Sequence, residues 1–154
     1  MDDRFSMKGR NAIVTGATRG IGLAIARVFL ESGATVTLCG RKQEGVDAAL
    51  KDLTDHASNV LGVAAHVAKP GDLERLIAAA EERFGPVNTL VNNAGTNPYY
   101  GLIAESEDWA WDKTMDVNLR GPYLLSRELG AKMMAGDGGS IVNISSVAGL
   151  EAGP

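Results

Sequence analysis

Short apolar runs alternate with segments of helical period along this chain. Five runs rich in apolar and β-branched residues are typical of buried strands: 12–15, 35–39, 60–67, 89–92 and 140–144. Four segments between them are typical of helices: 21–30, 43–53, 70–84 and 107–134. In the first helix, one stripe holds Ile21, Ile25, Val28 and Phe29. Pro70 opens the third helix at its first turn.

Strict alternation of strand and helix predicts βαβ units with a parallel sheet and right-handed crossovers. Strands that are apolar almost throughout indicate a sheet covered on both faces. We therefore predict one domain over residues 1–154, a doubly wound parallel α/β sheet of Rossmann type with strand order 3-2-1-4-5. Within the last helix, Pro122 cannot donate to the carbonyl of Asn118, so a kink is expected there.

Composition and net charge limit the classes of protein to which this chain could belong. A chain of 154 residues that is 45% hydrophobic suits one compact domain. The net charge of −4 argues against a nucleic-acid binder, and no apolar run is long enough to predict a membrane span. The single cysteine, Cys39, fits a reducing cytoplasm, and residues 1–10 do not have the pattern of a signal peptide. No metal site is expected, because His56 and His66 lack partners at ligand spacing.

A glycine-rich turn between the first strand and its helix is the strongest candidate for ligand binding. Residues 15–22 have the sequence TGATRGIG. Glycine tolerates positive φ and lets a pyrophosphate approach the main chain, and the helix N-terminus offers free N–H groups to the anion. The required strand before and helix after are both predicted, so we expect a dinucleotide site; the alternative is a plain glycine turn.

The end of the second strand indicates which dinucleotide is bound. An acidic residue there favours NAD, whereas a nearby arginine accommodates the 2′-phosphate of NADP. Neither Cys39 nor Gly40 is acidic, Arg41 follows them, and Arg19 lies in the glycine turn. Because the arginine fork matches phosphate oxygens, the pair predicts NADP(H) in preference to NAD(H); the alternative is that both are solvated surface charges.

Polar residues also follow the fourth and fifth strands. Residues 92–95 read NNAG, and Ser145 and Ser146 precede Val-Ala-Gly. A serine at a strand end can donate to a carbonyl oxygen that gains charge during reaction. The Pro122 position leaves the carbonyl of Asn118 without its helical donor. The structural alternatives are an Asx turn, capping serines and a simple helix kink.

These segments, in this order, resemble the short-chain dehydrogenase/reductase family of the classical type, and among its members the 3-oxoacyl-acyl-carrier-protein reductases. The resemblance implies an NADP(H)-dependent oxidoreductase acting on a small carbonyl or alcohol substrate. It implies catalytic roles for Ser146, with Ser145 as second choice, and for the Asn118 carbonyl, which would hold a water in a proton relay. The implied cofactor contacts are Gly16, Thr18, Arg19, Gly20, Ile21, Gly22, Arg41, His66, Val67, Asn93, Ala94 and Gly95.

The chain departs from the family pattern after the third strand. The family often has an acidic residue before a valine there, which bonds the adenine amino group, and this chain has His66 before Val67. A neutral imidazole can accept from that amino group, or the histidine is structural.

The family's Tyr-x-x-x-Lys motif is expected beyond Pro154. None of the three tyrosines, Tyr99, Tyr100 and Tyr123, has a lysine four residues on. We therefore expect the N-terminal portion of a longer enzyme, inactive alone; the alternative is a catalytically silent protein that binds a nucleotide or a partner. Tyr99 and Tyr100 are expected at the substrate mouth.

The resemblance also implies a homo-oligomer, formed through the helix at 123–134, and two further strands. Without those strands the fifth strand would lie at an open sheet edge, which favours pairing with other chains.

Overall fold

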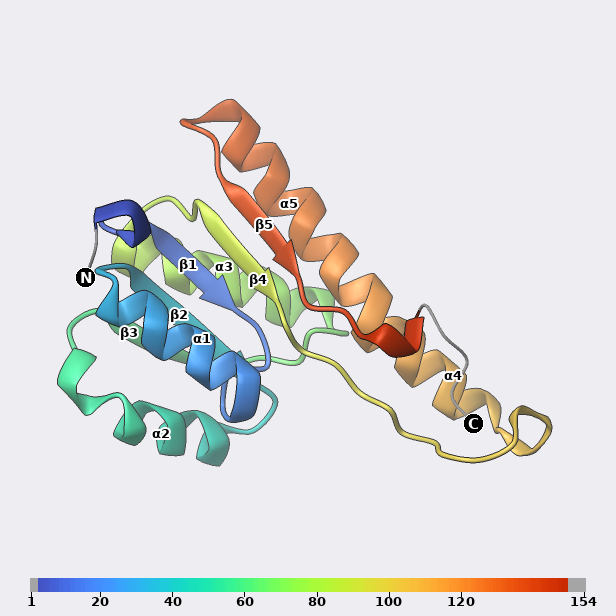
Figure 1. Ribbon diagram of the computed structural model, residues 1–154. Coiled ribbons are helices and arrows are strands. Elements are labelled where there is room, and N and C mark those ends of the chain that lie inside the picture. Colours follow the sequence, from blue (N-terminus) through green and yellow to red (C-terminus); the bar gives the residue numbers. More distant parts are fainter. Residues whose placement is uncertain (1–2, 150–154) are drawn as a thin grey trace.

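The computed structural model describes residues 3–149 and shows a five-stranded parallel sheet (Figure 1). The strands are β1 Asn11–Val14, β2 Thr35–Gly40, β3 Val60–Ala64, β4 Thr89–Asn92 and β5 Ser140–Asn143. They lie in the order β3-β2-β1-β4-β5, and each neighbouring pair is parallel. The predicted sheet, its order and its fold class are confirmed.

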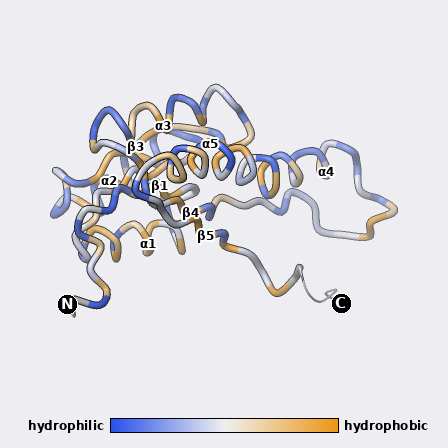
Figure 2. Tube along the Cα trace, turned by 90° about the horizontal axis from the view of Figure 1, so that it is seen from above, coloured by the Kyte–Doolittle hydropathy of each residue, from blue (hydrophilic) through white to orange (hydrophobic). Residues whose placement is uncertain are grey.

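Residues 3–149 contain five α-helices, and all but the fourth flank the sheet (Figure 1). They are α1 Gly20–Glu31, α2 Gln43–Asp52, α3 Pro70–Phe84, α4 Asp108–Met115 and α5 Gly121–Ala135. Seen from above in Figure 2, α3 and α5 lie on one side of the strands and α1 on the other. Within β1, Ile13 packs into the core under α3 and α5, whereas Ala12 and Val14 pack into the core under α1 and α2. Alternate residues of β1 thus pack into two cores, one on each face of the sheet. This explains why the strand is apolar almost throughout.

The buried stripe of α1 differs from the predicted one. Gly22, Ala26 and Leu30 are its buried residues, whereas Ile21 is 66% exposed and Val28 is 52% exposed. Small side chains at the start of this stripe let the first turn of α1 approach the glycine turn closely. Of the predicted stripe, Ile25 and Phe29 are partly buried and pack against the core, whereas the close contact at the start of the helix requires small side chains.

β3 also ends three residues before the predicted boundary, at Ala64. The main-chain N–H of His66 donates to the carboxylate of Asp72 on α3, over 2.8 Å. This bond holds residues 65–67 in the turn that leaves the sheet. The apolar side chains of this segment therefore pack into the core from a turn and not from a strand.

The predicted helical stretch from 107 to 134 is interrupted by a π-helical turn, Asp116–Arg120. There the N–H of Gly121 bonds the carbonyl of Asp116, five residues back. Pro122 has no N–H for Asn118, four residues back, or for Val117, five residues back. The interruption expected at Asn118 therefore takes the form of a π turn, a common device at functional sites.

β5 lies at the edge of the sheet and, among residues 3–149, pairs only with β4. Its apolar side chains are partly uncovered: Ile141 is 36% exposed and Val142 is 44% exposed. The expected open edge is therefore present in the described part of the chain.

Candidate functional site

A cavity of about 310 Å³ opens where the carboxyl ends of the strands meet. Segments that follow β1, β2, β3 and β4 all contribute to it, as expected for ligand sites in open α/β sheets. Ten of the twelve predicted cofactor contacts line it: Gly16, Thr18, Arg19, Gly20, Arg41, His66, Val67, Asn93, Ala94 and Gly95. The other two, Ile21 and Gly22, do not line it; Ile21 faces solvent and Gly22 is buried against the turn.

The glycine turn needs its glycines for two separate reasons. Gly16 and Gly20 have φ values of 63° and 58°, in the left-handed region that disfavours other residues. Gly22 is needed for space, because a Cβ there would lie 2.5 Å from Asn93 Nδ2 and 2.6 Å from the carbonyl oxygen of Gly16. The first turn of α1 is thereby pressed against the loop, and Gly20 at its start lines the cavity.

Asn93 fixes the turn from the end of β4. Its Nδ2 donates to the carbonyl of Thr15 over 2.9 Å and to that of Gly16 over 3.1 Å. The hydroxyl oxygen of buried Thr15 in turn accepts from the N–H groups of Asn93 and Ala94, each over 3.0 Å. Both amide protons of Asn93 are therefore committed to shaping the turn. Thr15 was missed as a site residue, although a buried threonine at a strand end is a usable signal.

The end of β2 forms a corner of the cavity beside the glycine turn. The side chain of Thr18 lies directly against Gly40, so a Cβ at residue 40 would collide with the threonine methyl group. Arg19 and Arg41 flank this corner, both exposed, and neither forms an ion pair within residues 3–149. The corner thus offers two unpaired positive charges and no room for a carboxylate at Gly40.

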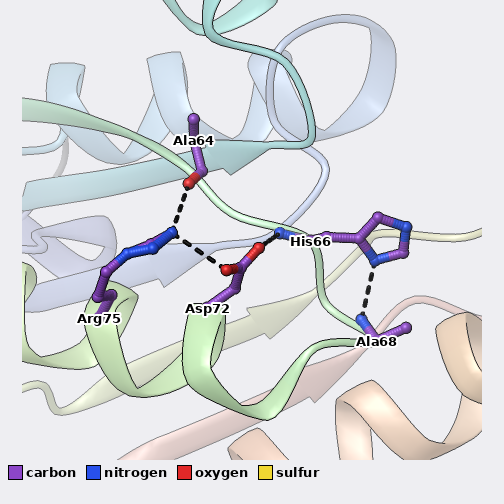
Figure 3. A network of polar contacts seen from close by, with 5 residues as sticks. All are labelled: Ala64, His66, Ala68, Asp72 and Arg75. Atoms are coloured by element: carbon purple, nitrogen blue, oxygen red, sulfur yellow. Dashed lines mark hydrogen bonds and ion pairs between the residues drawn. The ribbon is translucent and has the colours of Figure 1, made fainter.

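His66 is held in a polar network at the end of β3 (Figure 3). Asp72 accepts from the main-chain N–H of His66, and Arg75 donates both to that carboxylate over 3.2 Å and to the carbonyl of Ala64 over 3.1 Å. The main-chain N–H of Ala68 donates to Nδ1 of the imidazole over 3.1 Å. Burial lowers the pKa of His66, and the nearby charges of Arg41 and Lys69 act in the same direction. The ring is therefore neutral at pH 7, with its proton on Nε2.

A second cavity brings together the predicted catalytic residues. Asn118, Ser145 and Ser146 all line it, together with Tyr123 of α5. The side chain of Asn118 binds the main chain of Thr96 twice: its Oδ1 accepts from the N–H and its Nδ2 donates to the carbonyl, both over 2.8 Å. The π turn is thus tied by a side chain to the loop after β4, and Asn118 and Leu119 of the turn line the cavity.

The two tyrosines expected at the substrate mouth lie elsewhere. The hydroxyl of Tyr99 donates to the carbonyl of Leu102 over 3.1 Å, and Tyr100 is 95% exposed. Neither lines one of the two cavities described above.

Two other kinds of site find no support in residues 3–149. No group of three His, Cys, Asp or Glu side chains in this part of the chain is placed to hold a metal ion. No helix there is long and apolar enough to cross a membrane.

Comparisons with known proteins agree with this geometry. Human dehydrogenase/reductase SDR family member 4 is 39% identical over 154 residues, which are all of this chain and 55% of that protein. Human dehydrogenase/reductase SDR family member 2, mitochondrial, is 39% identical over 148 residues, 96% of this chain and 52% of that protein. The chain thus spans about half the length of these relatives.

Solved structures show the same fold. A putative short-chain alcohol dehydrogenase from Sinorhizobium meliloti superposes with a TM-score of 0.90 at 31% identity, over 97% of this chain and 59% of that one. A putative short-chain dehydrogenase from Novosphingobium aromaticivorans gives 0.90 at 34% identity, over 96% and 56%. A family model described as short chain dehydrogenase matches residues 10–154. The order of the motifs, the sheet and this match agree: the chain belongs to the short-chain dehydrogenase family.

Proposed function

We propose that this chain is the nucleotide-binding portion of an NADP(H)-dependent oxidoreductase that interconverts a small carbonyl compound and the corresponding alcohol. One observation carries the choice of NADP(H): Thr18 fills the space beside Gly40, and Arg41 comes next. An acidic side chain, which would bond a free ribose 2′-hydroxyl, has no room there, and the adjoining charge is positive.

The glycine turn fits the phosphates of such a cofactor. The close packing of Gly22 against Gly16 and Asn93 leaves the main chain as the wall of the cavity at this point. The first-turn N–H groups of α1 have no helical acceptors and would bind a pyrophosphate. Asn93 and Thr15 hold this surface in place through the hydrogen bonds described above. When bound, the nicotinamide ring would supply or accept the hydride.

Arg19 and Arg41 would bind the 2′-phosphate. Each is exposed and unpaired within the described residues, so binding would break no internal ion pair. A hydrogen bond to a charged group contributes about 1.5–3 kcal/mol, so losing one arginine would weaken binding roughly 10- to 100-fold. NADH has no 2′-phosphate, so its binding would depend little on either arginine.

The test is equilibrium binding of NADPH and of NADH to the 154-residue chain and to Arg41→Leu. NADPH binding is expected to weaken at least about tenfold and NADH binding to change less than about twofold. Arg10→Leu is the matched control, because Arg10 is exposed and precedes β1 at the opposite end of the strand. Equal losses for both cofactors in Arg41→Leu would contradict the NADP(H) assignment.

We also propose that this chain binds cofactor without turning over substrate. Ser146 would donate to the reacting oxygen, and the Asn118 carbonyl would hold a water. The proton donor has no candidate here, because no tyrosine in the sequence precedes a lysine by four residues. NADPH-dependent ketone reduction by the purified chain would contradict this proposal. The alternative function is that of a catalytically silent protein that binds a nucleotide or a partner.

The remaining expectations stay predictions from sequence. They are a reducing cytoplasm, a homo-oligomeric full-length protein, and a resemblance within the family to 3-oxoacyl-acyl-carrier-protein reductases. The second and third can be tested together by purifying the full-length protein and measuring its molar mass in solution and its activity on 3-oxoacyl thioesters.

A further inference from the structure

We infer that His66 is a specificity-determining residue that reads a ring nitrogen of the purine base, by donating from Nε2–H, and does not bind the exocyclic amino group. This inference rests on the proposed dinucleotide function. It also replaces the expectation that the imidazole accepts from that amino group.

The hydrogen bond from the main-chain N–H of Ala68 determines which ring nitrogen of His66 accepts and which donates. A main-chain N–H can only donate, so Nδ1 of His66, 3.1 Å away, carries the lone pair. In the neutral ring the proton then sits on Nε2. Figure 3 shows Nδ1 turned toward Ala68 and the other ring nitrogen on the far side of the ring, away from that turn. The free polar group of His66 is therefore a donor.

Hydrogen bonds at the main chain of His66 and at its ring hold the imidazole in this orientation. Asp72 accepts from the main-chain N–H of His66 over 2.8 Å, and Arg75 fixes that carboxylate against the carbonyl of Ala64. A ring flip would give up the Ala68 bond and leave its N–H unpaired beside a carbon atom. The orientation is thus set by the fold before any ligand arrives.

The surrounding charges keep the ring neutral. Arg41 after β2, Lys69 in the turn before α3, and Lys113 on α4 are positive and disfavour a second proton, and Asp72 on α3 acts in the opposite direction. A second proton would also sit on Nδ1, where the N–H of Ala68 already points.

A dinucleotide bound in the cavity would have its base beside His66. The phosphates would lie at the glycine turn and the ribose at the end of β2, near Arg41, so the base attached to that ribose lies toward the end of β3. The cavity wall there is formed by His66, between buried Ala65 and Val67. Adenine offers donors at its amino group and acceptors at its ring nitrogens. A donor on the protein can satisfy only the ring nitrogens.

The test uses 2′-phospho-ADP-ribose carrying adenine, purine without the 6-amino group, or 1-, 3- or 7-deazaadenine. Binding of each is measured by calorimetry to the wild-type chain and to His66→Phe, which keeps a flat ring and removes the donor. His56→Phe is the control, because this second histidine lies outside the cavity.

Wild-type binding is expected to change less than about twofold when the amino group is removed. One deaza ligand should bind about five- to tenfold more weakly, the scale of one neutral hydrogen bond, and this loss should vanish in His66→Phe. In His66→Asp, which presents an acceptor, the amino group should gain importance instead.

Two results would overturn the assignment. One is a loss that follows the 6-amino group and depends on His66; the other is that no change of the base depends on His66. Failure of the adenine ligand itself to bind the wild-type chain would overturn the proposed function, and this assignment with it. The two failures are therefore distinguishable.

Discussion

Replacing Gly22 by alanine should destabilise the fold through one crowded contact. The new Cβ would lie 2.5 Å from Asn93 Nδ2, 2.6 Å from the carbonyl oxygen of Gly16 and 2.8 Å from Ala17 Cα. Two of these three atoms belong to the main chain, so the side chain of Asn93 is the part that can move. Moving it would strain its hydrogen bonds to Thr15 and Gly16.

The magnitude follows from two opposing effects. Overpacking a close contact costs about 1–3 kcal/mol. Alanine in place of glycine in a helix recovers roughly 0.5–1 kcal/mol, and the φ of Gly22 is not positive, so this gain applies. We expect a net loss of about 1–2 kcal/mol in the free energy of unfolding, with weaker NADPH binding because the turn itself is displaced.

The assay is urea unfolding followed by far-UV circular dichroism, with Gly71→Ala as control. Gly71 also lies in the first turn of a helix, α3, but a Cβ there would meet nothing within 4 Å. That variant should be roughly 0.5–1 kcal/mol more stable than the wild-type chain. Equal stability of the two variants would refute the reasoning, because it would mean that the contact around Gly22 can relax without cost.

Three further predictions test other parts of the structure. Burial lowers the pKa of His66 below its ordinary 6.5, so the unfolded chain takes up the proton first; stability should fall as pH drops below about 6.5, and His66→Gln should reduce that slope in urea titrations at several pH values. Burial raises the pKa of Cys39 to about 12, so a thiol reagent at pH 8 should label the native chain slowly and the urea-unfolded chain quickly; rapid native labelling would contradict its burial. Lys132 donates to Glu81 across 2.7 Å between α5 and α3, but both side chains are partly solvated, so Lys132→Ala should cost less than about 1 kcal/mol, with a smaller cost at high salt.

The sheet could be predicted from the sequence because residues close together in the chain indicate each strand and each helix. Each strand is a short apolar run, and the alternation of strands and helices together with right-handed crossovers leaves few possible topologies. The ends of α3 were predictable for the same reason: Pro70 and Gly85 mark them directly. The glycine turn was predictable because its spacing and its place between strand and helix occur together.

What could not be predicted depends on partners distant in the sequence. Pro122 showed that a donor is missing, but the choice of a π turn also involves Gly121, where a Cβ would lie 2.8 Å from the carbonyl oxygen of Val67. The role of Asn93 depends on carbonyls 77 and 78 residues away. The direction of the His66 hydrogen bond depends on the turn to Ala68, whose geometry no periodicity encodes.

The π turn between α4 and α5 restricts how the length of this protein can change during evolution. A π turn holds one residue more than the α-helical path it replaces, so it is a fixed insertion within an otherwise regular rod. Because the wide π turn absorbs its extra residue, deleting one residue from 116 to 120 would restore α-helical winding and leave α4 and α5 nearly in register. The cost of such a deletion would fall on the turn itself, because Asn118 would lose its alignment with Thr96. In the loop from 97 to 102, the hydroxyl of Tyr99 bonds the carbonyl of Leu102 within the same loop, so natural length variation should concentrate there and be absent from the π turn.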